Sequence, residues 1–289
     1  MAVVSFPTDV GVIDLMIGVP SPDQHATYDY LRKGLRDESR DATMPADYLF
    51  HDLPPDTADG ISTLLTEMDR HGIERGMANV SERTVEMAAR FPDRLSLNLE
   101  VTDPNDVVGS VQAVRQAHEA HGIVAVSAFP AGPVPQVPVD DPKMYPLYAT
   151  CVELGLPAVV NAGIAGPRVP SACQHVERFD QVCYDFPDLA VVMRHGAEPW
   201  EQLAVKLMLK WPGLHYMTSA FAPKYYPRAI VDYANTRGAD KVMYAGYYPM
   251  ALTLDRIFTE LPDVPLRDDV WPRFLRNNAL RVFDLASVL

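Results

Sequence analysis

Short runs of consecutive apolar and β-branched residues recur along the chain and predict eight strands. Because the runs are continuous rather than alternating, they are typical of strands buried on both faces of a parallel sheet. The eight runs cover residues 10–17, 73–80, 94–101, 122–129, 156–162, 189–195, 213–219 and 240–246.

Amphipathic segments separate these runs, with apolar residues returning every three or four positions as in a helix that lies on a sheet. Examples are TADGISTLLTEMDRHG, NDVVGSVQAVRQAHEAHG and PWEQLAVKLMLKWPG. Eight strand–helix units in 289 residues favour a closed (β/α)8 TIM barrel over an open doubly wound sheet. No GxGxxG or GxxxxGK[ST] motif follows a run, which argues against a nucleotide-binding fold.

Two segments depart from the regular alternation. Residues 19–56, rich in Pro, Asp, Tyr and Arg, form a long insertion after the first strand, and we predict that they are a lid over an active site. Residues 266–289 follow the eighth unit and predict a C-terminal helical segment that closes the barrel. The regular alternation predicts a single domain over residues 1–289.

The composition narrows the range of partners. The net charge is -13, with acidic residues spread along the chain, so no basic face is expected for nucleic acid or for an anionic membrane. Three irregularly spaced cysteines do not make a disulfide framework or a metal knuckle. No apolar run reaches the roughly 20 residues of a membrane span. We therefore expect a cytoplasmic protein whose partner is a small-molecule substrate.

Several polar residues stand at the predicted strand ends, where the chemistry of such a barrel is located. His195 ends the sixth run and could exchange protons near neutral pH, or be a buried histidine bound to a backbone carbonyl. Asn161 could orient a carbonyl or carboxylate, or only form a turn. Tyr247 and Tyr248 could be phenol donors or packing residues of the wall.

Charged residues near the same ends have structural alternatives. Arg168 and Arg194 are candidate clamps for a substrate carboxylate, although loop arginines are often solvated or structural. Glu100 could be buried and paired instead of catalytic, and Asp14 could be a barrel residue bound to neighbouring backbone. The other residues at the strand ends are Met16, Gly18, Asn79, Phe129, Ser219 and Gly246.

The order of several fragments resembles the amidohydrolase-related branch of the amidohydrolase superfamily. The fragments include VIDLMIGVP, MDRHGIERGM, DDPKMYPLYATCVELGLPAVVNAG, FPDLAVVMRHGAEPW, DKVMYAGYYP and RNNALRVFDL. That branch contains aminocarboxymuconate-semialdehyde decarboxylase, hydroxybenzoate-type decarboxylases and related hydrolases and hydratases. The resemblance implies a TIM barrel with a divalent metal, commonly zinc, at the strand ends, and a homo-oligomer, either a dimer or a tetramer.

The metal-binding pattern of this family is degenerate here. The family's first strand carries D-x-H-x-H, but Asp14 is followed at those positions by Met16 and Gly18. Asn161 stands where the fifth strand usually ends in a ligand histidine, and Tyr247 stands at the Asp of the eighth-strand F-G-S-D-x-P motif. Thioether and phenol groups are poor ligands for zinc or a harder divalent ion.

Only His195 remains of the ligand set that the resemblance implies. We therefore expect no catalytic zinc, and no water activated by a metal. The alternative is a metal held by Glu100 or Glu198 together with His195.

Two functions are consistent with this pattern. The first is a metal-independent enzyme, a lyase or a hydrolase, with a small carboxylated or carbonyl-bearing substrate. In it His195 is the general acid/base, and Asn161 and Tyr247 polarise the substrate. The second is a non-catalytic descendant that binds a small molecule or regulates a partner subunit. The residues expected to contact the substrate are Met16, Gly18, Arg168, Arg194, Ser219 and Tyr248.

Overall fold

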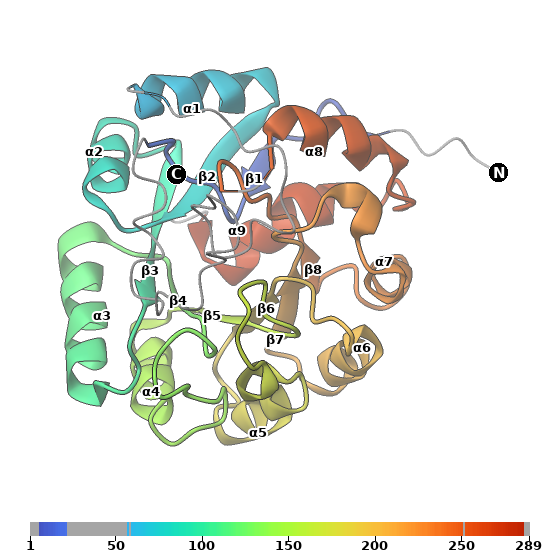
Figure 1. Ribbon diagram of the computed structural model, residues 1–289. Helices are drawn as coiled ribbons and strands as arrows, with labels where there is room; N and C mark the ends of the chain where they lie inside the picture. Colours follow the sequence, from blue (N-terminus) through green and yellow to red (C-terminus); the bar gives the residue numbers. More distant parts are fainter. Residues whose placement is uncertain (1–5, 22–56, 58, 251, 286–289) are drawn as a thin grey trace.

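The computed structural model describes residues 6–21, 57, 59–250 and 252–285. Eight parallel strands lie side by side in the order of the sequence and curl around a common centre, with all but the last of the main helices arranged outside (Figure 1). The predicted TIM barrel is therefore confirmed. The strands are β1 Val12–Asp14, β2 Ile73–Asn79, β3 Leu95–Val101, β4 Ala125–Ala128, β5 Ala158–Asn161, β6 Val191–Arg194, β7 Leu214–Met217 and β8 Val242–Met243.

A helix follows each strand, and each of the eight predicted apolar runs contains one strand. The main helices are α1 Gly60–Arg70, α2 Glu82–Arg90, α3 Val107–His121, α4 Tyr145–Leu154, α5 Arg178–Asp185, α6 Glu201–Lys210, α7 Arg228–Ala234, α8 Leu254–Glu260 and α9 Asn278–Val282.

Local signals in the sequence explain several helix ends. The Ser81 side chain accepts a hydrogen bond from the Thr84 N–H and the Thr84 hydroxyl accepts one from the Ser81 N–H, a reciprocal cap that begins α2. Asp106 caps α3 by accepting from the Gly109 N–H. Gly122 ends α3 in the left-handed conformation, which glycine adopts without steric cost.

The apolar side chains form two main cores. One lies between the sheet and the surrounding helices and contains buried residues from nearly every element. The other fills the barrel interior with side chains such as Ile13, Met77, Val159 and Met217. This inner core closes the barrel floor and leaves the opposite end, where the strands terminate, for polar groups.

The C-terminal segment packs into that inner core. A short π-helix, Arg273–Asn277, precedes α9, and Phe283 and Leu285 are buried with the side chains of the barrel interior. Of the lid predicted at residues 19–56, positions 22–56 lie outside the described residues.

The first and last strands are joined at their carboxyl ends. Ile17 and Tyr248 form a parallel bridge, and the Gly18 N–H donates to the Tyr248 carbonyl at 2.8 Å. Asp14 adds a side-chain link, because its Oδ1 accepts from the Gly246 N–H at 2.7 Å. A Cβ at Gly246 would lie 2.5 Å from Oδ2 of Asp14, so this approach requires glycine.

The Asp14 carboxylate is completely buried. Besides Gly246, it accepts from the Met16 N–H at 3.0 Å, and the Tyr244 hydroxyl lies 3.3 Å from Oδ2. Burial raises its pKa to about 6, and the three hydrogen bonds oppose that rise by stabilising the ionised form. These contacts agree with the interpretation of Asp14 as a structural residue that binds neighbouring backbone.

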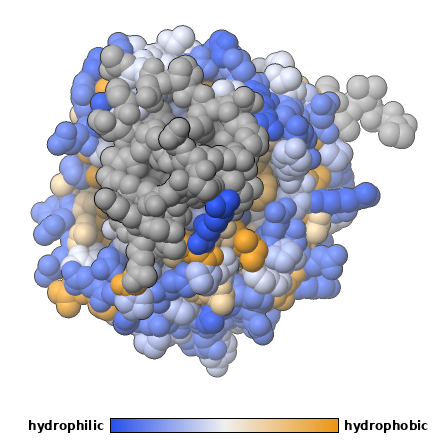
Figure 2. Space-filling view, in the orientation of Figure 1, coloured by the Kyte–Doolittle hydropathy of each residue, from blue (hydrophilic) through white to orange (hydrophobic). Residues whose placement is uncertain are grey.

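The surface is mostly hydrophilic on the face shown in Figure 2, with scattered hydrophobic residues. Exposed large apolar side chains include Ile164 and Tyr225. Within the described residues, no helix has the length and apolarity to cross a bilayer.

We predict that Asp14→Ala is less stable than Asp14→Asn by about 2–4 kcal/mol, because only the amide keeps an acceptor for the two buried N–H groups. Urea unfolding of both variants at pH 7 measures this difference. Equal stabilities would contradict the linking role of Asp14.

The raised pKa of Asp14 also predicts a pH dependence. The folded protein holds the Asp14 proton more tightly than the unfolded chain, so stability falls as pH rises from about 4 to about 6 and is level above that. The contribution is about 3 kcal/mol, since the pKa moves from 3.8 to about 6. The free energy of unfolding of the wild type minus that of Asp14→Asn, measured from pH 3 to pH 7, should decrease by this amount. A constant difference would show that the carboxylate titrates normally.

Candidate active site

A cavity of about 1340 Å³ opens at the carboxyl ends of the strands. This is a large volume for a small-molecule site. Of the residues expected at the site, those that line it are Met16, Gly18, Asn161, Arg194, His195, Tyr247 and Tyr248. Glu100 on β3 lines it as well.

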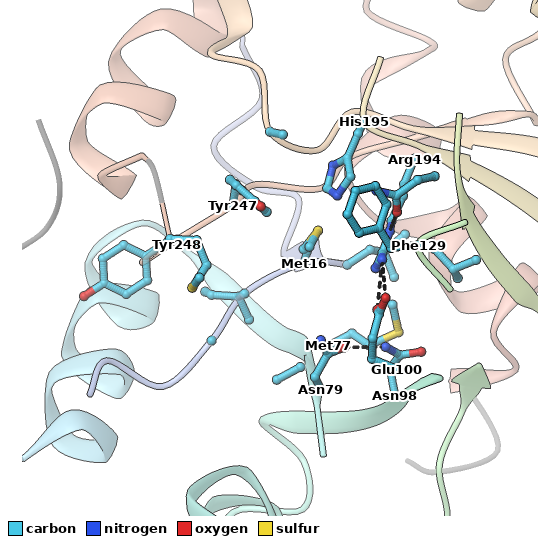
Figure 3. Close-up of a pocket in the computed structure, with 18 of the residues that line it drawn as sticks. Met16, Met77, Asn79, Asn98, Glu100, Phe129, Arg194, His195, Tyr247 and Tyr248 are labelled. Carbon is cyan, nitrogen blue, oxygen red and sulfur yellow. Dashed lines mark hydrogen bonds and ion pairs between the residues drawn. The ribbon is translucent and has the colours of Figure 1, made fainter. Parts of the chain in front are cut away.

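A buried ion pair crosses the cavity floor. Nη2 of Arg194 lies 2.9 Å from Oε1 and 2.8 Å from Oε2 of Glu100, and Figure 3 shows the two side chains facing each other. The side chains are 6% and 14% exposed, so the pair is shielded from bulk water. Of the interpretations proposed for Glu100, the buried and paired one describes its position.

Further hydrogen bonds extend this pair across the ends of five strands. The Arg194 Nε–H donates to Oδ1 of Asn161. The Ser127 hydroxyl donates to Oε2 of Glu100 at 2.5 Å, and Asn98 Nδ2 donates to Ser127 Oγ at 2.7 Å. Asn98 Nδ2 also lies 2.5 Å from Oδ1 of Asn79. The guanidinium is thus held in one orientation by groups on both sides.

Two donor groups of this network remain available. Among the described residues, no oxygen accepts from Nη1 of Arg194 or from Nδ2 of Asn161. Both residues line the cavity. Each can therefore donate to an oxygen of a bound molecule, and the guanidinium does so with a full positive charge.

His195 lies at the end of β6, beside Arg194. Its backbone has a φ of 67°, and Ala197 and Ala220 have φ values of 59° and 68°, so non-glycine residues adopt the left-handed conformation after both β6 and β7. Such conformations are unfavourable and occur often at functional sites. Here they turn the chain where it leaves the sheet.

The His195 imidazole is neutral at pH 7. Burial lowers its pKa well below the usual value, and the nearby charge of Arg194 lowers it further. Its Nδ1 lies 2.9 Å from Ser219 Oγ, and its ring meets that of Tyr247 edge to face at 5.3 Å between centroids. The structure therefore brings His195, Arg194, Asn161 and Tyr247 to one cavity.

Other expected residues lie elsewhere. Ser219 is completely buried and contacts His195 from outside the cavity lining. Arg168 is exposed and is not part of the lining. Tyr248 lines the cavity, but its hydroxyl points away from the Arg194–Glu100 pair (Figure 3). Gly18 contributes its backbone to the junction of β1 with β8.

The family model described as amidohydrolase matches residues 41–285, which is most of the chain. The chain belongs to the amidohydrolase family. No curated protein matches it.

Solved structures share the fold of this amidohydrolase. An uncharacterized TIM-barrel protein from Bordetella bronchiseptica is 23% identical, with a TM-score of 0.77 over 96% of this chain and 100% of that one. A dihydroxybenzoic acid decarboxylase from Polaromonas with bound manganese is 13% identical (TM-score 0.66, 96% and 98%). A 4-oxalomesaconate hydratase from Rhodopseudomonas palustris is 16% identical (TM-score 0.60, 96% and 96%).

Among the described residues, the side chains at the strand ends do not fit a resident divalent metal. Met16 and Tyr247 line the cavity where the family pattern has a histidine and a carboxylate, and Asn161 binds Arg194 instead. The Arg194 guanidinium brings a fixed positive charge to the same strand ends. In the described part of the chain, no three His, Cys, Asp or Glu residues are grouped to hold a metal.

The alternative metal ligands are also engaged or isolated. Both oxygens of Glu100 accept from Arg194, so this carboxylate has little capacity left for a cation. Glu198 lines the cavity, and burial, with a smaller contribution from Glu201, raises its pKa. A raised pKa disfavours the ionised form that a metal would need.

Asn98 and Ser127 were not among the residues expected at the site. Both are buried and polar within otherwise apolar strands. Asn98 precedes Glu100 by two positions on β3, so both point to the same side of the strand. Two polar residues spaced two positions apart in a buried strand are the sequence signal that could have indicated this network.

We predict that Glu100→Gln destabilises the protein by about 3–5 kcal/mol, because the Arg194 charge stays buried without its counter-ion. Glu153→Gln is the matched control, since Glu153 also binds an arginine, Arg115, through both oxygens but on the surface. It should cost less than about 1 kcal/mol. Thermal and urea unfolding measure both, and similar losses in the two variants would contradict a special role for the buried pair.

Proposed function

We propose that this amidohydrolase is a metal-independent enzyme that acts on a small carboxylated or carbonyl-bearing molecule by proton transfer. The reaction class is a lyase, such as a decarboxylase or hydratase, or a hydrolase. One observation carries the proposal: a fixed guanidinium with an open donor edge and a neutral histidine line the same cavity.

The residues divide the task by their chemistry. Arg194 anchors an anionic oxygen through Nη1, and Asn161 donates to a second oxygen through Nδ2. His195 is the acid/base group, and Tyr247 stands beside it as a phenol donor. Proton transfer of this kind contributes about 10²- to 10⁴-fold in rate, so orientation and exclusion of water must supply the rest.

The charge of the cavity supports an anionic ligand. The chain carries a net charge of -13, which would repel acids on average. Among the described residues, by contrast, the charged side chains that line the cavity are balanced, three arginines against three glutamates: Arg83, Arg194, Arg256, Glu82, Glu100 and Glu198. An acid entering the cavity therefore meets no excess of negative charge.

The names of the structural neighbours agree with this substrate class. Dihydroxybenzoic acid and 4-oxalomesaconate are both carboxylic acids, handled by a decarboxylase and a hydratase. Manganese is bound in the decarboxylase. We propose that a protein cation, Arg194, provides charge here in place of a metal ion, and that the protein is a homo-oligomer of the cytoplasm.

The second candidate is a small-molecule binder without turnover. Met16 and Gly18 favour it, because the strand that carries two histidines in the family pattern supplies only a thioether and backbone here.

The test is turnover of a panel of aromatic and unsaturated acids, including 2,6-dihydroxybenzoate, together with metal analysis of the purified protein. We expect turnover without stoichiometric metal, and a loss of about 10²-fold or more in kcat/KM in His195→Ala. His121→Ala, on the exposed end of α3, is the control and should match the wild type.

Stoichiometric zinc, or equal activity in His195→Ala, would contradict this function. Saturable binding of panel acids with no turnover would instead support the binding protein.

A further inference from the structure

Among the described residues, Ser219 is the one hydrogen-bond partner of the His195 ring. Nδ1 lies 2.9 Å from Ser219 Oγ, and the same oxygen accepts the His195 backbone N–H at 3.2 Å. His195 lines the cavity, and Figure 3 shows its ring next to Arg194 and Tyr247. Nε2 is therefore the ring nitrogen left for a bound molecule.

The proton between Nδ1 and Ser219 can belong to either group, and the choice sets the chemistry of Nε2. If the serine donates, Nδ1 is the acceptor and Nε2 carries the hydrogen. If Nδ1–H donates, Nε2 has a lone pair and can act as a base. The two forms make His195 either a donor or a proton acceptor toward the cavity.

The surroundings of Ser219 decide between them. Ser219 is completely buried, and its Oγ already accepts one hydrogen bond from the backbone. Within the part of the chain that the structure describes, Nδ1 of His195 is the one acceptor in reach of its hydroxyl hydrogen. A second N–H aimed at Oγ would leave that hydrogen unpaired in a dry site, which is unfavourable.

We propose that Ser219 is a positioning residue that fixes His195 as the Nε2–H tautomer, so that the imidazole presents a hydrogen-bond donor to the substrate. The role of this donor in a reaction rests on the proposed function, whereas the tautomer itself can be measured without turnover. The lowered pKa of His195 supports it, because it keeps the imidazole neutral, and a neutral imidazole carries a hydrogen on one of its two ring nitrogens.

The proposal specifies what the ligand must offer. Nε2–H of His195, Nη1 of Arg194 and Nδ2 of Asn161 are all donors that line one cavity. The matching ligand presents acceptor oxygens, as a carboxylate with a neighbouring carbonyl or hydroxyl oxygen does. In this tautomer His195 first hydrogen-bonds an oxygen of the ligand that gains negative charge. It can act as a base at Nε2 only when Ser219 and Nδ1 exchange their donor and acceptor roles.

The experiment is a long-range 1H–15N spectrum of the full chain labelled with 15N-histidine, recorded at pH 7 without ligand. His195→Asn identifies the His195 signals by their loss. His175 is an internal reference, because its Nδ1 accepts the Glu177 N–H at 3.1 Å and cannot carry a hydrogen in that bond.

We expect the His195 pattern of a protonated Nε2 and an unprotonated Nδ1. In Ser219→Ala the fraction with hydrogen on Nδ1 should rise at least about fivefold, the factor equivalent to about 1 kcal/mol, while His175 is unchanged. Hydrogen on Nδ1 in the wild type would overturn the proposal, and this result needs no variant to fold. An unchanged tautomer ratio in Ser219→Ala would also overturn it.

These outcomes are independent of turnover. A protein with the Nε2–H tautomer but no activity on any acid would retain this inference and refute the proposed enzyme. Activity with hydrogen on Nδ1 would do the reverse.

Discussion

Asp14 is completely buried, so its carboxylate needs hydrogen-bond donors from the protein. It receives them at the carboxyl ends of β1 and β8, where the first and last strands of the barrel meet. Its Oδ1 accepts hydrogen bonds from the backbone N–H groups of Met16, beyond β1, and Gly246, beyond β8. This contact, with the bridge between Ile17 and Tyr248, links the carboxyl end of the first strand to that of the last. The polar groups of the cavity floor depend on that geometry, because each comes from a different strand.

The positive charge of Arg194 is a second constraint, because it limits the chemistry that the site can support. A guanidinium binds oxygens through directional N–H groups, whereas a divalent metal ion accepts lone pairs and can acidify a bound water. An arginine can therefore orient a carboxylate and balance its charge, but it does not generate hydroxide near neutral pH. A barrel with this cation is better suited to reactions in which the substrate supplies its own leaving group than to metal-assisted hydrolysis.

The sequence alone was sufficient for the architecture because each strand lies in a short run rich in apolar residues, even though β2 and β3 also contain polar ones. Residues next to strand ends, such as His195 and Arg194, could also be placed, since parallel strands end on one side of the barrel. Contacts between side chains on different strands could not be predicted from the sequence. The contact of Arg194 with Glu100 joins β6 to β3, and only the curvature of the sheet brings them together. Likewise, the contact of Ser219 with His195 joins the segments after β7 and β6, where residues in the left-handed conformation turn the chain.

The ion pair on the cavity floor also bears on how the site comes into being. A metal ion enters a barrel that has already folded, so its charge can arrive late. Arg194 and Glu100 are 94 residues apart in the chain and meet only where the barrel brings β6 and β3 together, so the site gains this charge as part of folding. In the proposed function, the cation of the site is therefore part of the folded polypeptide, and it cannot be exchanged or removed by a chelator.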